Sequence, residues 1–414
     1  MNPLQQIEQQ VLAEGREWTR RRLEEQLQQQ ADAMPAVCPS SGEALRDTRW
    51  RPFELDTVVG TVTIRARYGY SQAQKRWMCP ARATWALEKY QRLSPELQQR
   101  LCYTATQVSS YERAAAMARC WGSPVSDDRI HVHVRRQGTA ALELTLPAEK
   151  PSPAEPEFSL VIMMDGWMAR ERGPDWGASQ KTRDACRVAW HEIKSAVIYR
   201  LDQRAEKQSG RALLVEKFVV ACPPETEPVD FGAAVHAEAM RRGLGRAKTV
   251  YVVIDGAVWL WHVAQDRFAT AVKTLDFQHA SEHLRAVGQA LHGEGSEASR
   301  AWVEKHLHDL RHGKELRVVR RLEELLEDGQ KRSKQTEAVI EREVRYLSGH
   351  REHMHYAAME KAGAPLGSGA MESQNSQWQR RFKTCGQFWR RGGLTSLLGL
   401  SVLFQNGDQT HLWN

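Results

Sequence analysis

The sequence predicts an α/β domain interrupted by an all-helical insertion and preceded by a mainly helical region with a small β segment. Apolar, β-branched runs alternate with helical patterns after residue 157. A proline-rich stretch at 145–157 separates them from the N-terminal region, and residues 291–362 are charged and almost uniformly helical in pattern. A chain of 414 residues can bury a full core and divide into two or more domains.

The excess of basic over acidic residues suits a polyanionic partner. The net charge is +7 and the sequence pI is about 9.0. No apolar run approaches the roughly 18 residues that a membrane helix needs, and the N-terminus lacks a secretory pattern. We therefore expect no membrane partner and a cytoplasmic, nucleoid-associated protein. The seven cysteines are scattered and odd in number, so we expect reduced thiols.

The first 90 residues comprise two predicted segments. Residues 1–35 form an amphipathic helical arm, which either packs on its own domain or self-associates. Residues 36–90 carry strand signals and resemble a degenerate zinc ribbon. Cys38 and Cys79 each stand where such a ribbon has a pair of cysteines, and two thiolates cannot complete a four-coordinate site. We expect zinc to be absent.

Residues 91–144 have the rhythm of a helix-turn-helix. Gly122 ends one helix and Ser126 is a suitable N-cap for the next. The second helix carries three arginines that we expect to contact DNA, namely Arg129, Arg135 and Arg136. An ordinary helical hairpin would show the same pattern.

The α/β domain begins after the linker, over 158–290, and is completed by residues 363–414. Three strand signals in a row, a helix near 230–242 and a strand near 248–255 are the opening order of an RNase H-like fold. In that fold the first and fourth strands are neighbours. Asp165 and Asp255, each at the end of an apolar run and followed by glycine, should then lie together.

Glu372 is a third candidate acid, because a glycine-rich turn precedes it and a helical pattern follows. A carboxylate at the end of a buried strand is unfavourable unless a partner or metal compensates the charge. Asp165, Asp255 and Glu372 are therefore predicted as catalytic residues that bind Mg²⁺, for which Mn²⁺ could substitute. Two ions could activate a nucleophile and stabilise the leaving oxygen at phosphorus. Asp-Gly is also common in turns, and glutamate is favourable at any helix start.

Four segments resemble the RNase H-like DDE transposases of bacterial insertion sequences. They are Met164-Asp165-Gly166, 253–259, 275–284 and 366–373, and the resemblance spans roughly residues 36–414. It implies an acid triad of Asp165, Asp255 and Glu372, dependence on magnesium, and cleavage and joining of the DNA ends of the element. Asp276 and His279 match the family's C/D-x-x-H motif, which supports the active site or orients DNA. The missing cysteines put a zinc-dependent DNA-binding module in doubt.

Two alternatives remain open. His279-Ala-Ser-Glu282-His283 matches the H-x-x-E-H pattern of a zinc metalloprotease. A transposase-derived protein could also bind DNA as a regulator without catalysis.

The C-terminal segment is basic and aromatic. We expect it to contact DNA through Arg380, Arg381, Lys383, Trp389, Arg390 and Arg391. Trp389 could stack on an unpaired base. Because two element ends must be handled together, the expected partners are double-stranded DNA and a second copy in a homodimer.

Overall fold

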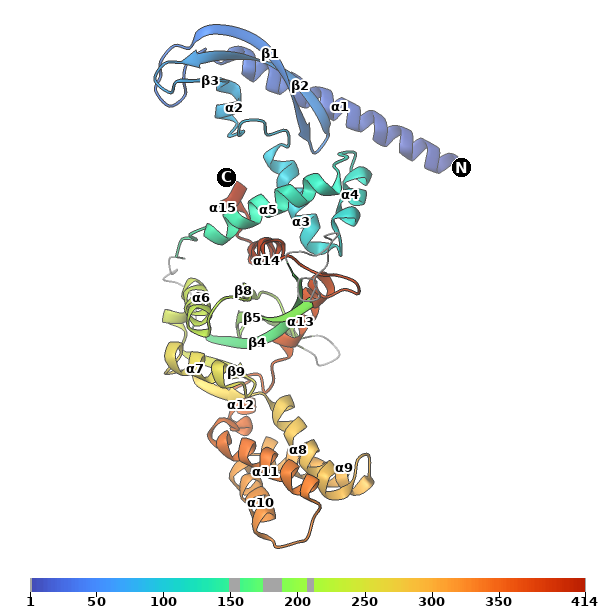
Figure 1. Ribbon diagram of the computed structural model, residues 1–414, viewed down its shortest axis with the longest axis vertical. Helices are drawn as coiled ribbons and strands as arrows, with labels where there is room; N and C mark the ends of the chain where they lie inside the picture. The colour runs from blue at the N-terminus through green and yellow to red at the C-terminus, as the bar shows by residue number, and fades with distance from the viewer. Residues whose placement is uncertain (1, 149–156, 174–187, 207–211, 414) are drawn as a thin grey trace. The chain divides into compact units, whose positions relative to one another are not determined.

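The computed structural model describes residues 2–148, 157–173, 188–206 and 212–413 (Figure 1). The chain divides into two compact units, one of Met1–Leu144 with Asp408–Asn414 and the other of Thr145–Gly407. No helix among the described residues is long and apolar enough to cross a membrane.

The N-terminal unit begins with a long helix and an antiparallel sheet. Helix α1 (Pro3–Ala33) lies along strand β2 (Gly60–Ser71), which pairs with β1 (Arg46–Thr57) and β3 (Arg76–Met78). Helix α2 (Pro80–Thr84) follows. The core between α1, β2 and α2 includes Ala31, Val62, Ile64, Cys79 and Ala81. Residues 3–33 of the predicted arm are helical, and the second half of this helix packs on its own unit.

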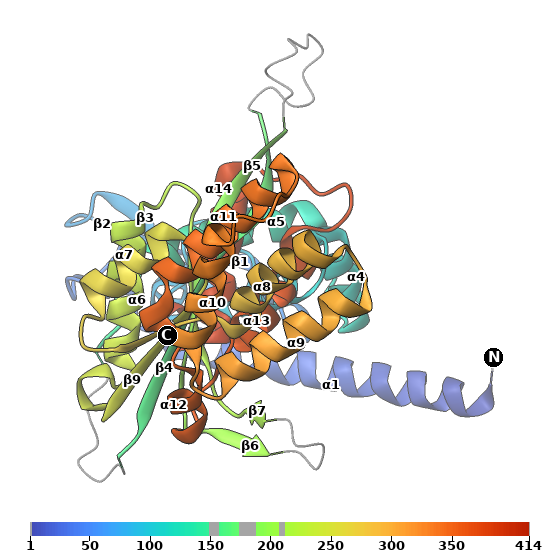
Figure 2. The ribbon, with the colours of Figure 1, turned by 90° about the horizontal axis from the view of Figure 1, so that it is seen from below.

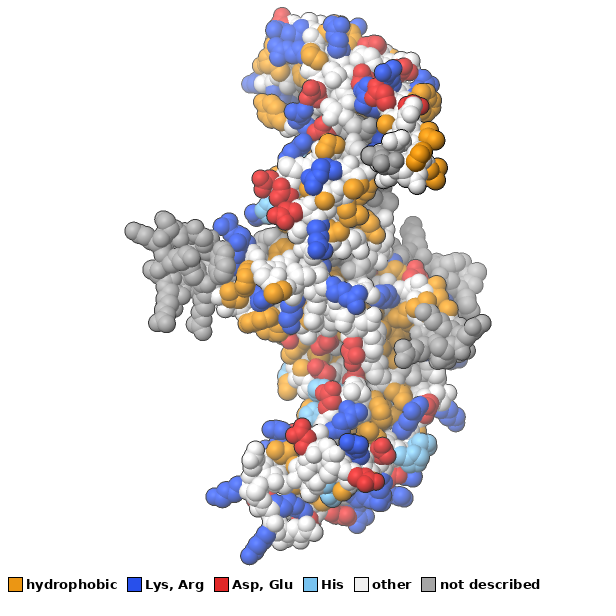
Figure 3. All heavy atoms as spheres, turned by 90° about the vertical axis from the view of Figure 1, so that its right-hand side faces the viewer, with side chains coloured by type: hydrophobic (Ala, Val, Ile, Leu, Met, Phe, Trp, Pro, Cys, Tyr) orange, Lys and Arg blue, Asp and Glu red, His pale blue; other side chains and the backbone are white. Residues whose placement is uncertain are grey.

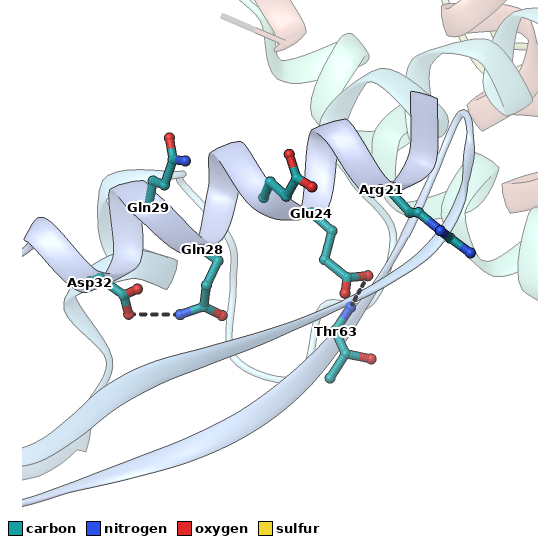
Figure 4. Close-up of a pocket in the computed structure, with 7 residues that line it drawn as sticks. Arg21, Glu24, Gln28, Gln29, Asp32 and Thr63 are labelled. Atoms are coloured by element: carbon teal, nitrogen blue, oxygen red, sulfur yellow. Dashed lines mark hydrogen bonds between the residues drawn. The ribbon is translucent and has the colours of Figure 1, made fainter. Parts of the chain in front are cut away.

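Side chains of α1 form hydrogen bonds with backbone groups of β2 in the part of that strand that does not pair with β3. The side-chain amide of Gln28 donates to the Arg65 carbonyl and accepts from the Arg65 N–H, both at 2.9 Å. One turn earlier Glu24 accepts from the Thr63 N–H at 3.3 Å. Glu24, Gln28 and Thr63 line a shallow pocket of about 400 Å³ (Figure 4). Because a free strand edge exposes unpaired backbone groups, Gln28 substitutes for a missing neighbouring strand.

Three further helices complete this unit, with a turn between the second and third where the sequence predicts one. They are α3 (Pro95–Gln107), α4 (Tyr111–Cys120) and α5 (Asp127–Glu143). Gly122 adopts a φ of +83° after α4, a conformation that glycine adopts without strain. Ser126 caps α5 by accepting from the Arg129 N–H. The short helix α15 (Thr410–Trp413) contacts α3 and α5.

The second unit is built on a five-stranded mixed sheet. Its strands are β4 (Ser159–Arg172), β5 (Val188–Arg200), β8 (Phe218–Cys222), β9 (Thr249–Ile254) and β10 (Val272–Leu275). The strand order is β10-β9-β4-β5-β8. β4 is parallel to β9 and β9 to β10, while β5 is antiparallel to β4 and to β8. The predicted pairing of the first and fourth strands is therefore confirmed.

Helices cover both faces of this sheet (Figures 1 and 2). On one face, α6 (Pro228–Arg241) and α7 (Val258–Arg267) pack on alternate residues of β4 and β9 such as Ile162 and Val252. Contacts with β4, β5 and β8 place α13 (Gly369–Phe382) and α14 (Arg391–Gln405) against the sheet as well. Shorter elements are β6 (Arg204–Glu206), β7 (Ala212–Leu214) and the 3-10 turn η1 (Leu244–Arg246).

The predicted insertion is helical and has its own core. The helical run begins before the predicted boundary at residue 291, with α8 (Phe277–His292). It continues through α9 (Glu297–Arg311), α10 (Glu315–Glu327), α11 (Lys334–Gly349), η2 (Arg351–His353) and α12 (Tyr356–Lys361). Buried residues from these elements include Leu284, Leu310, Leu322, Val344 and Tyr356. Helices α8, α9, α10 and α11 lie alongside one another in Figure 2.

Candidate active site

Asp165 and Asp255 are brought side by side by the pairing of β4 with β9. The last paired residues are Met164 and Ile254, and each immediately precedes one of the two aspartates. Neighbouring strands lie about 4.8 Å apart, so the two backbones are adjacent at this point. The apolar, β-branched runs before the two aspartates explain why each forms a strand. The two aspartates are 90 positions apart in sequence, and the parallel pairing of β4 with β9 brings them together.

The surroundings of Asp165 oppose its ionisation. The pKa of this carboxyl is raised to about 6, chiefly by burial and also by the negative charge of Asp255, against a lowering by the Gly166 N–H. The hydrogen bond from Asn375 lowers this pKa, while Glu192 raises it. Two like charges in a partly buried place are unfavourable, and a bound cation would relieve the repulsion.

Asn375 holds Asp165 from helix α13. Its Nδ2 donates to Asp165 Oδ2 at 2.7 Å, and its Oδ1 accepts from the Ser195 hydroxyl at 3.1 Å. Asn375 is 5% exposed, and Ser195 lies opposite Asp165 on β5. We did not predict either residue. Helical spacing offered a signal for Asn375, because it follows Glu372 by three positions and thus lies one turn further along the same helix.

Glu372 lies in the first turn of α13 and is exposed. Among the residues that the structure describes, no three or more His, Cys, Asp or Glu side chains are grouped so that they could hold a metal ion. The structure thus joins Asp165 to Asp255 and links Asp165 to the helix of Glu372, but it does not gather all three acids into one metal-binding group. The pair alone fits Mg²⁺, which needs only one or two carboxylates beside water and substrate phosphates.

A side chain from another segment lies close to the glycine after each aspartate. A Cβ on Gly166 would lie 2.2 Å from Glu192 Oε1, and a Cβ on Gly256 would lie 1.7 Å from the Tyr346 hydroxyl oxygen. Neither glycine has a left-handed φ. Close approach of the Tyr346 ring, whose hydroxyl is buried, therefore leaves no room for a Cβ at Gly256. Beside Gly166 the contact is with the flexible, partly exposed side chain of Glu192, which can move aside. Glu192 and Tyr346 come from distant segments and carried no sequence signal.

Asp276 is engaged by backbone groups. It is 3% exposed and caps α8, with Oδ1 accepting from the N–H groups of Gln278 and His279 at 2.6 and 3.1 Å. Its Oδ2 accepts from the Ser368 N–H at 2.6 Å, at the start of α13. The backbone N–H of Asp276 donates to the carbonyl of Ile254, the residue before Asp255. Asp276 therefore connects the end of β9 with the start of the helix that carries Glu372.

The histidines of the H-x-x-E-H pattern pack beside Tyr346. The His283 ring stacks on Tyr346 with centroids 3.6 Å apart, and His283 Nδ1 pairs with Glu343. The His279 ring lies 5.0 Å from that of His283 and is partly exposed. Burial lowers the pKa of His283 despite this partner. Glu343, rather than a metal, occupies the Nδ1 side of His283.

Burial corrects two of the predicted DNA contacts in the C-terminal segment. Trp389 is 7% exposed, and its indole N–H donates to the Phe382 carbonyl at 2.8 Å. Its backbone pairs with β4 through Arg170 and Arg172. No ring face is therefore open to an unpaired base. Arg381 is 5% exposed and lies over the Trp389 ring, so this guanidinium cannot serve as a surface phosphate contact.

The other basic residues of this segment differ in their surroundings. Arg391 forms ion pairs with Glu171 and Glu225, at 2.7 and 3.0 Å. Arg380 and Arg390 are exposed and Lys383 is half-buried. The ammonium of Lys383 lies 5.2 Å from the ring of Trp190, a tryptophan that is 49% exposed.

Two of the three arginines of α5 have partners within the N-terminal unit. Arg129 pairs with Asp56 at 3.0 Å, and Arg136 pairs with Glu88 at 2.7 Å. Arg135 is exposed. DNA contact by this helix remains a prediction, and Arg135 is the arginine best available for it.

Comparison with known proteins adds a family match for the N-terminal third. Residues 6–151 match the model of an uncharacterised protein family, UPF0236. No curated protein matches the chain. Among solved structures, the Drosophila P element transposase strand transfer complex has a TM-score of 0.36 and 10% identity, covering 76% of this chain and 93% of that chain.

Proposed function

We propose that this protein is a DDE transposase with an RNase H-like catalytic domain, which binds the ends of its insertion sequence and catalyses metal-dependent strand cleavage and transfer. The supporting observation is the placement of Asp165 and Asp255 at the same end of adjacent parallel strands, with Asp165 held by Asn375 from the helix of Glu372. The strand order, in which the first strand lies between the second and the fourth, supports the RNase H-like assignment.

Asp165 and Asp255 would hold Mg²⁺ or Mn²⁺, and Glu372 would complete the set. The bound ions would supply positive charge for an in-line displacement at phosphorus. The protein's own groups orient this site. Asn375 fixes the direction of the Asp165 carboxylate, and Asp276 fixes the start of α13 relative to the end of β9. Arg380, Lys383 and Arg390 offer positive charge to DNA phosphates on the C-terminal segment.

The test uses the full-length protein and duplexes with the inverted repeats that flank its gene. We expect Asp165→Asn, Asp255→Asn and Glu372→Gln each to abolish cleavage and joining while end binding persists, because each change removes a ligand charge and keeps the shape. Asp266→Asn, an exposed acid on α7, is the matched control and should cleave normally. Cleavage near the wild-type rate in any of the three variants would remove that residue from the triad.

The exposed position of Glu372, outside any metal-binding group, favours a second candidate, a transposase-derived regulator that binds DNA without cutting it. Such a protein would bind the same repeats as a homodimer or monomer and leave them intact with Mg²⁺ or Mn²⁺. Cleavage by the wild-type protein, lost in the three acid variants, would exclude this alternative.

A further inference from the structure

The sheet of the N-terminal unit carries a dense group of basic residues. Segments 46–51 and 65–76, which include parts of β1, β2 and β3, contain seven basic residues and one acid, Asp47. The whole chain has a net charge of +7, so the rest of the protein is almost neutral. Figure 3 shows Lys and Arg side chains gathered near the top, on the unit that contains β1 and β2 in Figure 1. The seven are Arg46, Arg49, Arg51, Arg65, Arg67, Lys75 and Arg76.

These seven side chains have no acidic partner in the described part of the chain. Six of them are exposed and one is half-buried, and none forms an ion pair with a described residue. Two acids of the same unit are engaged elsewhere. Glu43 accepts from the N–H groups of Gln72 and Ala73, both at 3.0 Å, and Asp56 pairs with Arg129. Because like charges without partners repel one another, an anionic ligand would stabilise this surface.

The strand register places these cations on both faces of the ribbon that β1 and β2 form. Trp50 lies directly opposite Arg67. Side chains alternate between the two faces of a strand, so Arg65 and Arg67 share the face of Trp50. Arg49 and Arg51 project from the other face. Strand β1 is also an edge of its sheet, so a ligand can approach both faces from that side.

A tryptophan lies against an arginine on each face. The guanidinium carbon of Arg67 is 5.0 Å from the ring centroid of Trp50, and that of Arg49 is 4.9 Å from the ring centroid of Trp77. The two tryptophans are 39% and 48% exposed. A guanidinium stacked on a ring keeps its donors free at its edge and loses less freedom when it binds an anion. Each face therefore presents a positioned cation to solvent.

Cations on both faces fit a groove bordered by phosphates better than a flat surface. A planar anionic membrane would contact one face only. The major groove of B-form DNA is about 12 Å wide and admits a two-stranded β-ribbon. The major groove of an RNA duplex is too narrow for protein side chains to enter. Because guanidinium groups bind phosphates through two parallel hydrogen bonds, arginine suits both walls of such a groove.

We propose that the β1 edge of the N-terminal sheet is a contact surface for duplex DNA, in which arginines on the two faces bind phosphates on the two sides of one groove. The arginines are Arg49, Arg51, Arg65 and Arg67. The inference rests on the proposed function for the choice of DNA as partner, and it assigns a surface separate from the aspartate pair and from α5.

The experiment measures binding of the full-length protein to a fluorescent duplex of scrambled sequence, without metal, over a range of salt concentrations. Replacing the four arginines with Gln should lower the slope of log affinity against log salt by about 3 units, since each lost phosphate contact contributes about 0.9. Replacing them with Lys keeps the charge and should keep the slope. The matched control replaces four exposed arginines of the helical insertion with Gln and should also keep the slope. These are Arg300, Arg317, Arg320 and Arg345.

An unchanged slope in the Gln variant, or an equal fall in the control, would overturn the proposal. The four arginines would then only protect the edge of β1 from pairing with other strands. Circular dichroism checks folding. If the fourfold variant is unfolded, Arg49→Gln with Arg67→Gln replaces it, with an expected fall of about 2 units.

Two further probes separate the partners. The same Gln variant should change binding to an RNA duplex less than binding to DNA, and it should leave any binding to vesicles of phosphatidylserine and phosphatidylcholine unchanged. An equal loss on RNA, or a loss on vesicles alone, would contradict DNA as the partner. Scrambled sequence and the absence of metal keep this test independent of the acid triad, so failure of the cleavage experiment would not alter its result.

Discussion

Asn375 Nδ2 donates a 2.7 Å hydrogen bond to Asp165 Oδ2 across 210 positions of sequence. The bond joins α13 to β4, so the helix that carries Glu372 is fixed relative to one of the two paired aspartates. The same carboxylate stands beside Asp255 and has a pKa near 6. Loss of the Asn375 donor should therefore alter how Asp165 ionises.

We expect Asn375→Ala to move the acid limb of the cleavage pH profile to higher pH. The Asn375 donor stabilises the charged form of Asp165, so its loss raises a pKa that is already about 6. Gln377→Ala, an exposed position on α13, is the control and should leave the profile unchanged. If Asn375→Ala and Gln377→Ala give the same pH profile, the hydrogen bond from Asn375 does not govern the ionisation of Asp165.

Asp165→Asn should stabilise the metal-free protein at neutral pH by roughly 2 to 3 kcal/mol, because the folded pKa of about 6 exceeds the ordinary value of 3.8. Below the ordinary value both states are protonated and the two proteins should be equally stable. As pH rises through 6, the wild-type protein loses stability relative to the variant. Urea titrations at pH 4 and pH 7.5 measure the difference.

Replacing Asp202 should change stability in the opposite direction, and this substitution serves as the control. The Arg200 guanidinium lowers its pKa, so its contribution is present above the ordinary carboxyl pKa and is lost as pH falls through the folded value. Asp202→Asn should therefore reduce stability at neutral pH. If Asp165→Asn and Asp202→Asn both increase stability at neutral pH, the increase is a general effect of removing a charge.

Tyr346→Phe should raise the free energy of unfolding by about 1 kcal/mol. The Tyr346 hydroxyl is buried, and no described residue hydrogen-bonds to it. The phenylalanine keeps the stacking on His283 and removes only the unsatisfied group. Tyr90→Phe, at a side chain that is 83% exposed, should change stability by less than about 0.5 kcal/mol. A clear loss of stability in Tyr346→Phe would show that the hydroxyl has a partner in solution.

Gly256→Ala should destabilise the protein by about 2 kcal/mol or more, since the added methyl group would overlap Tyr346. Gly349→Ala, at the end of α11 with open space around it, should be neutral or slightly stabilising. Tyr346→Ala removes the overlapping group, so the two substitutions together should cost less than the sum of their separate losses. If the two losses add, the steric explanation for this glycine is wrong.

Replacing Arg380, Lys383 and Arg390 together with Gln should reduce the slope of log affinity for DNA against log salt by up to about 2 to 3 units. Preference among DNA sequences should stay nearly the same, because phosphate contacts position the protein without distinguishing bases. Arg320→Gln with Arg345→Gln, exposed positions on the insertion, is the control. An unchanged slope in the triple variant would place the DNA path elsewhere.

Local sequence determined the elements and several of their boundaries. Alternating or continuous apolar runs identified β4 and β9, Gly122 and Ser126 marked the turn before α5, and the charged periodic stretch identified the helical insertion. The order of strands and helices was enough to predict that Asp165 and Asp255 would be neighbours, because few topologies accommodate that order.

Only the tertiary structure decided which side chains surround those acids and which basic residues are free. Asn375, Glu192 and Tyr346 approach the aspartates from other elements through packing that no local pattern records. Arginine and tryptophan are residue types that an exposed DNA-binding segment also contains. Arg381 and Trp389 are nevertheless buried, and the backbone of Trp389 pairs with β4. Residue type and spacing specify periodicity along one element, whereas burial depends on contacts between elements that are distant in sequence.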